Sequence, residues 1–388
     1  MTVTAPQGFR AAGVKAGLKA SGNPDLALVV NDGPSKAAAA VFTSNRVAAA
    51  PVHWSRQVVS DGRVDAVILN SGGANACTGP QGFQNTHATA EKTANVLGIS
   101  ATDVFVCSTG LIGEQLPMDK LLPAVDAAAA ALDADGGAAA AAAIMTTDTV
   151  PKQAVFKGVD AEGQEFTIGG IAKGAGMLAP GLATMLVVLT TDANVLPEML
   201  DFVLREATRV TFDRADSDGC MSTNDTVVLL ASGASGAVPS AEAFGKGLTQ
   251  VCAELARKLI GDAEGASHDI AIRTFNAASA RDAETVSRAV ARSNLFKAAI
   301  FGKDPNWGRV LSAVGTTDAA FEPDQLNVSM NGVRICRNGS IGEDRKLVDL
   351  EPREVIVEID LQAGSSEATI WTNDLTHDYV HENSAYSS

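Results

Sequence analysis

Thr184 lies where a loop rich in small residues, glycine and proline (residues 170–183) enters the apolar segment 185–189. This pattern is typical of a loop that leads into a buried strand. If the chain were cut in front of Thr184, that residue would hold both parts of a nucleophilic catalyst. Its hydroxyl would be the nucleophile, and its own free amine, with an ordinary pKa of about 7.7–8.0, would be the adjacent base. The pattern therefore allows two interpretations, an ordinary core strand and a catalytic chain terminus.

Cleavage of the Ala183–Thr184 bond needs no other protein under the second interpretation. The small residues before Thr184 let the backbone bend so that the hydroxyl can attack the Ala183 carbonyl, and the resulting ester then hydrolyses. The uncut chain is inert, because an amide nitrogen cannot accept the proton from the hydroxyl.

Three other motifs resemble nucleotide, calcium or zinc sites, but each lacks a residue or an element that such a site needs. Residues 174–179 match a loose dinucleotide fingerprint, but Pro180 falls where the helix of that motif should run. Residues 216–219 resemble part of a calcium loop, yet the outer ligand positions are wrong, so we expect a solvated turn. His377 and His381 lack the glutamate and the helical pattern of a zinc protease. We therefore expect no metal and no organic cofactor.

The composition limits the class of protein. Of 388 residues, 46% are hydrophobic and 19% charged, which is typical of a globular chain, and the formal net charge is −15. Nucleic acid is an improbable partner because no basic stretch is present. Five scattered cysteines without a CxxC pair favour a reducing compartment. No apolar run resembles a signal sequence or a membrane span, so we expect a soluble cytoplasmic protein.

The elements that must position these residues follow from the apolar patterns. Strands are expected over 26–31, 65–69, 103–107, 153–156, 226–231, 269–274, 326–336, 354–361 and 367–371. Helices are expected over 84–98, 117–132, 196–209, 241–260 and 281–300, and the Ala-rich stretch 127–143 reads as two helical pieces with a turn. In the helix over 281–300 we expect a buried stripe of Ala283, Val286, Val290, Leu295 and Ala298. Strands outnumber helices and do not alternate with them, which favours a layered α+β fold.

Five segments of the chain, in order, resemble the ornithine acetyltransferase family, the glutamate N-acetyltransferases of arginine biosynthesis. The segment around Thr184, KGAGMLAPGLATMLVVLTTDA, resembles the self-cleavage segment of that family. The other four are Cys107–Gly113, Ile144–Thr149, Gly302–Arg309 and Glu382–Ser388.

The resemblance implies an α+β fold of layered αββα type, similar to the N-terminal-nucleophile hydrolases, with two β-sheets packed between helical layers. It also implies self-cleavage into an α chain (1–183) and a β chain (184–388) that form one folded unit and assemble as an α2β2 heterotetramer. The implied reaction moves the acetyl group of N2-acetyl-L-ornithine to L-glutamate in two half-reactions through an acetyl-Thr184 ester. Whether acetyl-CoA is a second donor stays open.

The resemblance also assigns the site residues. Thr184 is the nucleophile, and Thr109 and Gly110, directly after an expected strand, supply the oxyanion donors that a tetrahedral intermediate needs. The residues matching substrate contacts are Thr146, Lys173, Thr184, Glu264, Asn383 and Ser388. The register of Thr146 against Thr147 stays open.

Without the family, several of these residues have ordinary explanations. Lys173 would be a surface lysine, Glu264 a carboxylate at a helix end, and Thr109-Gly110 a turn. The cluster after residue 302 is expected to be structural, with an Asp304–Arg309 ion pair and a packed Trp307.

Two alternatives remain at this stage. A self-processing aminopeptidase of similar fold would use water in place of the acetyl acceptor. A non-catalytic binding protein would keep the chain uncut, and its Thr184→Ala variant would behave like the wild type.

Overall fold

The computed structural model describes residues 2–179 and 185–385 of the chain. Within these residues the strands form three sheets. In spatial order, the four-stranded sheet contains β1 (Phe9–Val14), β2 (Leu26–Asn31), β4 (Ala66–Asn70) and β5 (Val104–Ser108). The five-stranded sheet contains β3 (Ala37–Phe42), β9 (Thr226–Ala231), β8 (Leu186–Thr191), β7 (Glu165–Lys173) and β6 (Lys152–Val159). The six-stranded sheet contains β13 (Ser340–Ile341), β12 (Val333–Arg337), β11 (Asn327–Met330), β14 (Glu354–Asp360), β10 (Asp269–Ala277) and β15 (Ser366–Asn373).

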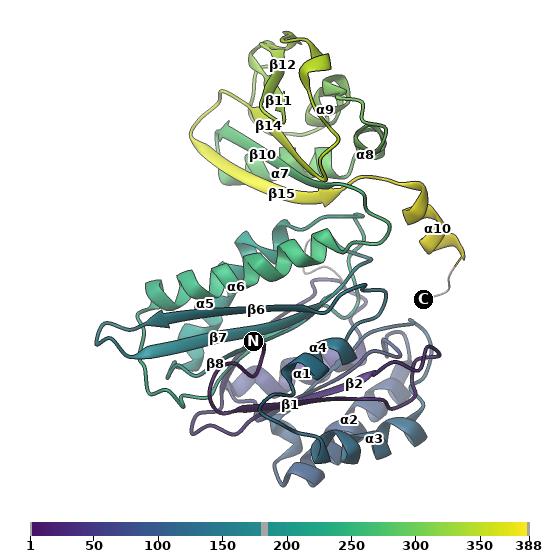
Figure 1. The fold of residues 1–388 in the computed structure, drawn as a ribbon, viewed down its shortest axis with the longest axis vertical. Helices are drawn as coiled ribbons and strands as arrows, with labels where there is room; N and C mark the ends of the chain where they lie inside the picture. The colour runs from purple at the N-terminus through teal and green to yellow at the C-terminus, as the bar shows by residue number, and fades with distance from the viewer. Residues whose placement is uncertain (1, 180–184, 386–388) are drawn as a thin grey trace.

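The α-helices lie between and around these sheets (Figure 1). They are α1 (Ala50–Val58), α2 (Gly79–Leu97), α3 (Met118–Ala130), α4 (Gly137–Ala143), α5 (Pro197–Val210), α6 (Ala241–Gly261), α7 (Ala280–Ala291), α8 (Asn294–Phe301), α9 (Trp307–Val314) and α10 (His377–Ala385). None of the helices in the described part of the chain is long and apolar enough to cross a membrane.

The four- and five-stranded sheets share one core. Val29 and Leu69 of the first sheet lie in the same apolar cluster as Val188 and Val228 of the second. The alternation along β8 explains this arrangement, because Val188 points into the shared core while its neighbour Val187 packs under α5 and α6. Helices α2 and α3 cover the other face of the four-stranded sheet. The segment with the predicted cleavage site therefore connects two central strands, β7 and β8, of one packed unit.

The six-stranded sheet forms a C-terminal lobe (residues 269–373) at the upper end of the molecule in Figure 1. It has its own core, in which Ile270 and Val357 pack against Val286 of α7 and Val310 of α9. This third sheet is additional to the two sheets implied by the resemblance.

Most expected elements match the structure to within a few residues, and the Ala-rich stretch does divide into α3 and α4. The segment 326–336 is a hairpin rather than one strand. Asn331 and Gly332 join β11 to β12, and both have positive φ, as the two central residues of a type I′ turn require. Seven strands and helices of the described residues were not expected, namely β1, β3, β7, β13, α1, α9 and α10.

The prediction of a single helix over 281–300 is wrong. The Ser293 hydroxyl accepts a hydrogen bond from the Phe296 N–H and so starts a new helix, α8, after α7 has ended. The new axis changes which residues face the core. Leu295 is 65% exposed and Ala298 is exposed, whereas Phe296 and Ile300 are buried.

Three further expectations are corrected. Part of the 216–219 turn is buried rather than solvated, since the Asp216 carboxylate is buried and paired with Arg288 and Arg292 at 3.2 and 2.8 Å. The tail around His377 is helical (α10). The Asp304–Arg309 pair is replaced by two other contacts: Asp304 faces Arg345 at 3.5 Å, and Arg309 donates to the Leu295 carbonyl at 2.5 Å.

Candidate active site

The end of β7 and the start of β8 lie on either side of the segment that contains the predicted cleavage site. Lys173 ends β7, and Met185 directly precedes β8; both are buried, at 1% exposure each. Ala183 and Thr184, like Ser388, lie outside the described residues. We therefore describe the groups that contact Lys173 on one side of this segment and Met185 on the other.

The predicted oxyanion turn meets the end of β7. The Lys173 ammonium donates to the Thr109 hydroxyl at 3.4 Å, inside the protein rather than at its surface. The Thr109 N–H donates to the Asn70 carbonyl at 2.9 Å, which ties the turn to the end of β4. Gly110 has φ +131°, and a Cβ there would lie 2.7 Å from the Gly73 nitrogen, so only glycine fits.

Asp225 contacts Met185, on the other side of the segment that contains the predicted cleavage site. Its Oδ1 accepts the Met185 N–H at 2.9 Å, and within the described part of the chain its Oδ2 meets no donor. Complete burial raises the pKa of the Asp225 carboxyl well above its usual value, against the opposing effects of hydrogen bonds and of Lys173. Sequence reasoning missed this residue. Its only signal is its place directly before β9, which pairs in parallel with β8.

A buried ion cluster joins the segments that carry the predicted substrate residues. The Lys152 ammonium lies 2.6 Å from an Asp148 oxygen and 2.5 Å from an Asp262 oxygen, and the Lys152 side chain is 0% exposed. Asp148 also accepts the Thr146 N–H at 2.9 Å and the Gly174 N–H at 2.6 Å. The cluster thereby fixes the loop after α4, the end of β7 and the turn after α6 relative to one another.

Three predicted substrate residues line one cavity of about 560 Å³. Thr146, Glu264 and Asn383 come from three distant segments, and the Asn383 amide donates to the Glu264 carboxylate at 3.0 Å. Thr147 lines the same cavity, so the structure leaves both threonines in place for contact. A Cβ on Gly176 would collide with the Glu264 carboxylate, so the loop before Thr184 runs directly beside this side chain.

Thr109 and Lys173 do not line that cavity. They are linked to it through Asp148, which contacts both Thr146 and Gly174. The arrangement thus has two parts: a buried Thr109–Lys173 pair suited to stabilising negative charge on oxygen, and a polar cavity with a carboxylate suited to an ammonium group.

The model of the ArgJ family matches residues 10–388. The chain belongs to the ArgJ family. It is 66% identical to the arginine biosynthesis bifunctional protein ArgJ of Streptomyces coelicolor, over 388 residues that cover 100% of both chains. The protein of the same name from Thermobifida fusca is 64% identical over 388 residues, again covering all of both chains. These matches confirm the family that the five motifs indicated.

A solved relative is the ornithine acetyltransferase of Mycobacterium tuberculosis complexed with ornithine. It is 57% identical and aligns with 48% of this chain and 96% of its own chain, with a TM-score of 0.44.

In this ArgJ family member the Asp148 carboxyl is buried close to two lysine ammonium groups. Burial alone would raise the pKa of its carboxyl, but the Lys173 and Lys152 ammonium groups and the Gly174 N–H outweigh burial and lower the pKa to about 2. The Asp148 carboxylate is therefore ionised at neutral pH.

This lowered pKa predicts a specific acid sensitivity. The folded-state value of about 2 is below the ordinary value of 3.8, so the stability that ionised Asp148 contributes is complete above about pH 4 and is lost as the pH falls through about 2. Urea unfolding at pH 5, 4, 3 and 2 should show a steeper fall for the wild type than for Asp148→Asn. The exposed Asp126→Asn is the matched control and should keep the wild-type slope. Equal slopes for the wild type and Asp148→Asn would contradict the charge assignment.

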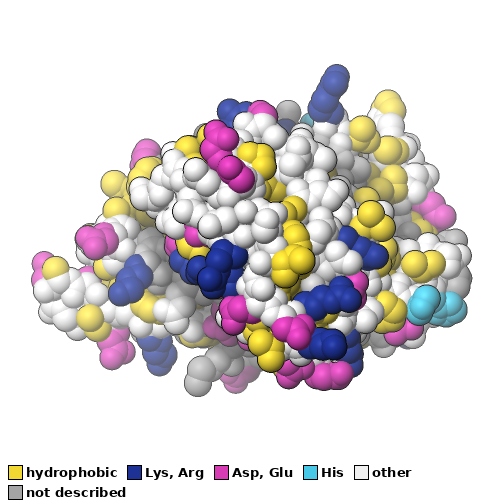
Figure 2. Space-filling view, turned by 90° about the horizontal axis from the view of Figure 1, so that it is seen from above, with side chains coloured by type: hydrophobic (Ala, Val, Ile, Leu, Met, Phe, Trp, Pro, Cys, Tyr) yellow, Lys and Arg dark blue, Asp and Glu magenta, His cyan; other side chains and the backbone are white. Residues whose placement is uncertain are grey.

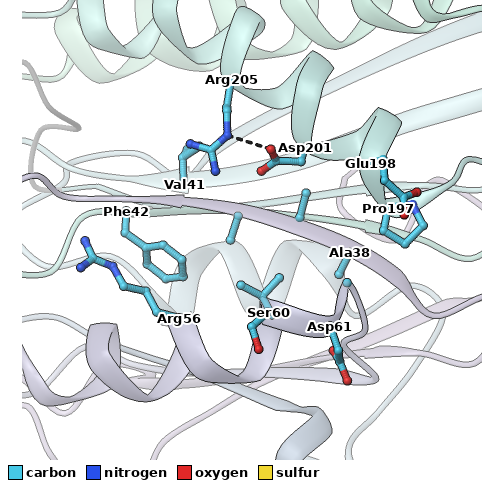
Figure 3. A pocket seen from close by; sticks show the side chains of 14 residues that line it. Ala38, Val41, Phe42, Arg56, Ser60, Asp61, Pro197, Glu198, Asp201 and Arg205 are labelled. Carbon is cyan, nitrogen blue, oxygen red and sulfur yellow. Dashed lines mark hydrogen bonds and ion pairs between the residues drawn. The ribbon is translucent and has the colours of Figure 1, made fainter.

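A cavity of about 700 Å³ lies elsewhere, along β3 between α1 and α5 (Figure 3). The charged groups around it are Arg56, which lies over the Phe42 ring, Asp61, Glu198 and the Arg205–Asp201 ion pair at 2.8 Å. None of the predicted site residues lines it, so we do not assign it to the reaction.

The face of the C-terminal lobe seen from above carries positive and negative side chains interspersed (Figure 2). No broad basic area that would suit a polyanion is visible on this face.

In the described residues, no group of three or more His, Cys, Asp and Glu side chains could hold a metal ion.

Proposed function

We propose that this protein transfers the acetyl group of N2-acetyl-L-ornithine to L-glutamate, with Thr184 carrying the acetyl group between them. The observation that carries the proposal is the similarity over the whole chain, at 66% identity, to an arginine biosynthesis bifunctional protein. The polar cavity around Glu264 and the buried Thr109–Lys173 pair support it, because they offer the charges that such substrates and intermediates need.

The nucleophile in this proposal is made by self-cleavage between Ala183 and Thr184. The products, residues 1–183 and 184–388, stay associated because their strands are interleaved in one sheet: β3, β7 and β6 belong to the first product, and β9 and β8 to the second. Asp225 supports the reaction by anchoring the Met185 N–H, next to the bond that is cut. The layered αββα arrangement of N-terminal-nucleophile hydrolases and an α2β2 assembly in the cytoplasm complete the proposal.

The first half-reaction acetylates the enzyme. The Thr184 hydroxyl attacks the acetyl carbonyl while its own amine accepts the proton, and the Thr109 hydroxyl and the Gly110 N–H donate to the oxyanion. The intermediate collapses with cleavage of the amide C–N bond. The proton passes to the leaving nitrogen, and ornithine departs.

The second half-reaction is the reverse with glutamate as the amine. Its nitrogen attacks the acetyl-Thr184 ester, the same donors hold the oxyanion, and N-acetyl-L-glutamate leaves. Lys173 is assigned to the substrate carboxylate and Glu264 to the ornithine ammonium, with Thr146, Asn383 and Ser388 as further contacts. No metal or organic cofactor takes part.

A second activity is favoured by the word "bifunctional" in the relatives' name. We propose that acetyl-CoA is an alternative donor that acetylates the same Thr184, which would let the enzyme make N-acetylglutamate without N2-acetylornithine.

The test follows an isotope-labelled acetyl group from N2-acetylornithine. With glutamate present, label should appear in N-acetylglutamate, and initial rates at varied concentrations of both substrates should give the parallel double-reciprocal lines of a ping-pong reaction. Label released only as free acetate would instead indicate the aminopeptidase-like hydrolase. No reaction of any kind would favour the binding protein.

A further inference from the structure

A second cavity borders the candidate site. Its volume is about 290 Å³, at the lower end of the range for small-molecule sites, and it lies between the turn at residues 217–219, α8 and α10. Its lining includes Asp218, Glu264, Arg292, Asn294, Lys297 and Tyr379. Glu264 lines both this cavity and the one that holds Thr146 and Asn383, so the two cavities share one carboxylate.

Lys297 is the buried cation in the lining of this second cavity. It lies in the first turn of α8 and is only 6% exposed, and its ammonium donates to the Ser217 carbonyl. Among the described residues no carboxylate lies within ion-pair distance of its ammonium. An ammonium has three donors, and burying it without a charged partner is costly. Two of its donors therefore remain for a ligand.

The neighbouring carboxylates already have their own hydrogen-bond donors. Asp218 accepts the Met177 N–H at 2.7 Å and the Cys220 N–H at 3.0 Å, and Asp374 is held by Ser267 and His268. The contact to Met177 also places the cavity beside the loop that leads to Thr184. Burial and the nearby Asp218 raise the pKa of the Tyr379 hydroxyl to about 12, which leaves it protonated as a further donor at neutral pH.

The proposed reaction poses a recognition problem that one carboxylate does not solve. The donor, N2-acetylornithine, ends in an ammonium, whereas the acceptor, glutamate, ends in a carboxylate. Both must present a nitrogen to the same Thr184. A site with only Glu264 at its distal end would repel the acceptor, and a site with only a cation would repel the donor.

We infer that Lys297 binds the side-chain carboxylate of the glutamate acceptor, while Glu264, in the lining of the same cavity, binds the ammonium of the donor. This inference rests on the proposed function and adds a specificity residue to it. Arg292, which is also paired with Asp216, and Asn294 line the same cavity as Lys297. The second cavity thus offers a carboxylate to the ammonium of the donor and an ammonium to the carboxylate of the acceptor.

The test separates the two half-reactions in Lys297→Met. Release of ornithine from N2-acetylornithine in a single turnover should stay within about twofold of the wild type. The kcat/KM for glutamate should fall about 10- to 100-fold, the effect of losing a charged hydrogen-bond partner. The kcat/KM for glutamine, a neutral acceptor of the same shape, should change little, so the preference for glutamate over glutamine should largely disappear. Lys297→Arg, which keeps the charge, should retain that preference.

Lys303→Met is the matched control, because Lys303 is exposed and paired with Glu351 on the surface. It should match the wild type in both half-reactions. If Lys297→Met lowers the folded yield, Lys297→Gln, which keeps a donor for the Ser217 carbonyl, allows the same comparison. Equal losses in both half-reactions, or an unchanged glutamate-to-glutamine ratio, would overturn the assignment of Lys297 alone. A wild-type enzyme that transfers no acetyl group would overturn the proposed function as well.

Discussion

Thr184→Ala is expected to leave the chain as one uncut polypeptide and to lower acetyl transfer by about 10⁴-fold or more, the scale of losing a catalytic nucleophile. Alanine has neither the hydroxyl that attacks the Ala183 carbonyl nor the group that carries the acetyl. Gel electrophoresis under denaturing conditions and the labelled-acetyl assay measure the two effects on one preparation.

Thr184→Ser is the control for that experiment. Serine keeps the hydroxyl, so its chain should still cleave and transfer, although more slowly. A Thr184→Ala variant that transfers acetyl groups at the wild-type rate would contradict the mechanism and favour the interpretation of Thr184 as an ordinary strand residue.

Lys152→Met should have the second largest effect. It leaves Asp148 and Asp262 buried without the ammonium that lies 2.6 and 2.5 Å from them. Breaking a buried ion pair in this way costs about 3–5 kcal/mol of unfolding free energy. The two like charges should also separate the loop of Thr146 from the turn of Glu264, and displacements of about 1 Å at a site lower kcat/KM about 10²-fold. Urea unfolding and initial rates with N2-acetylornithine measure both.

Lys258→Met provides the comparison for Lys152→Met. Lys258 is an exposed lysine of α6 paired with Glu254 at 2.6 Å, and its loss should cost less than about 1 kcal/mol with no change in rate. If Lys152→Met were as mild as Lys258→Met, the ion cluster would not be what holds the substrate segments together.

Much of the sheet framework was predictable, because β2, β4, β5 and β9 are short, fully buried strands that are apolar except at one end. Strand β3 was missed because its sequence, AAAAVF, has no β-branched residue before Val41, and alanine favours helices. The break between α7 and α8 was missed because both pieces are apolar at helical spacing, and only the cap at Ser293 marks the change.

Residues of the candidate site were predictable only where the resemblance to the family assigns them. Glu264 and Asn383 were placed from the resemblance, and the structure brings them within 3.0 Å of each other. The burial of Lys173 could not be read from the sequence, because it depends on the sheet that covers it. The sequence gives little signal for Lys152 and Asp225, because each has a partner far along the chain: Asp262 is 110 residues from Lys152, and Met185 is 40 residues from Asp225.

The site is also divided between the two proposed products of cleavage. Thr109 and Lys173 belong to residues 1–183, whereas Glu264 and Asn383 belong to residues 184–388. The Lys152–Asp262 ion pair joins the two. The proposed cleavage can therefore create the nucleophile while the other site residues stay in place.

The most direct test is the intact mass of the wild-type protein under denaturing conditions, before and after incubation with N2-acetylornithine without glutamate, with N-terminal sequencing of each species. We expect two fragments, residues 1–183 and a second that begins Thr-Met-Leu. After incubation, only the second should gain the mass of one acetyl group, which glutamate should then remove. A single uncut chain that never accepts acetyl, or acetylation at a residue other than Thr184, would contradict the mechanism.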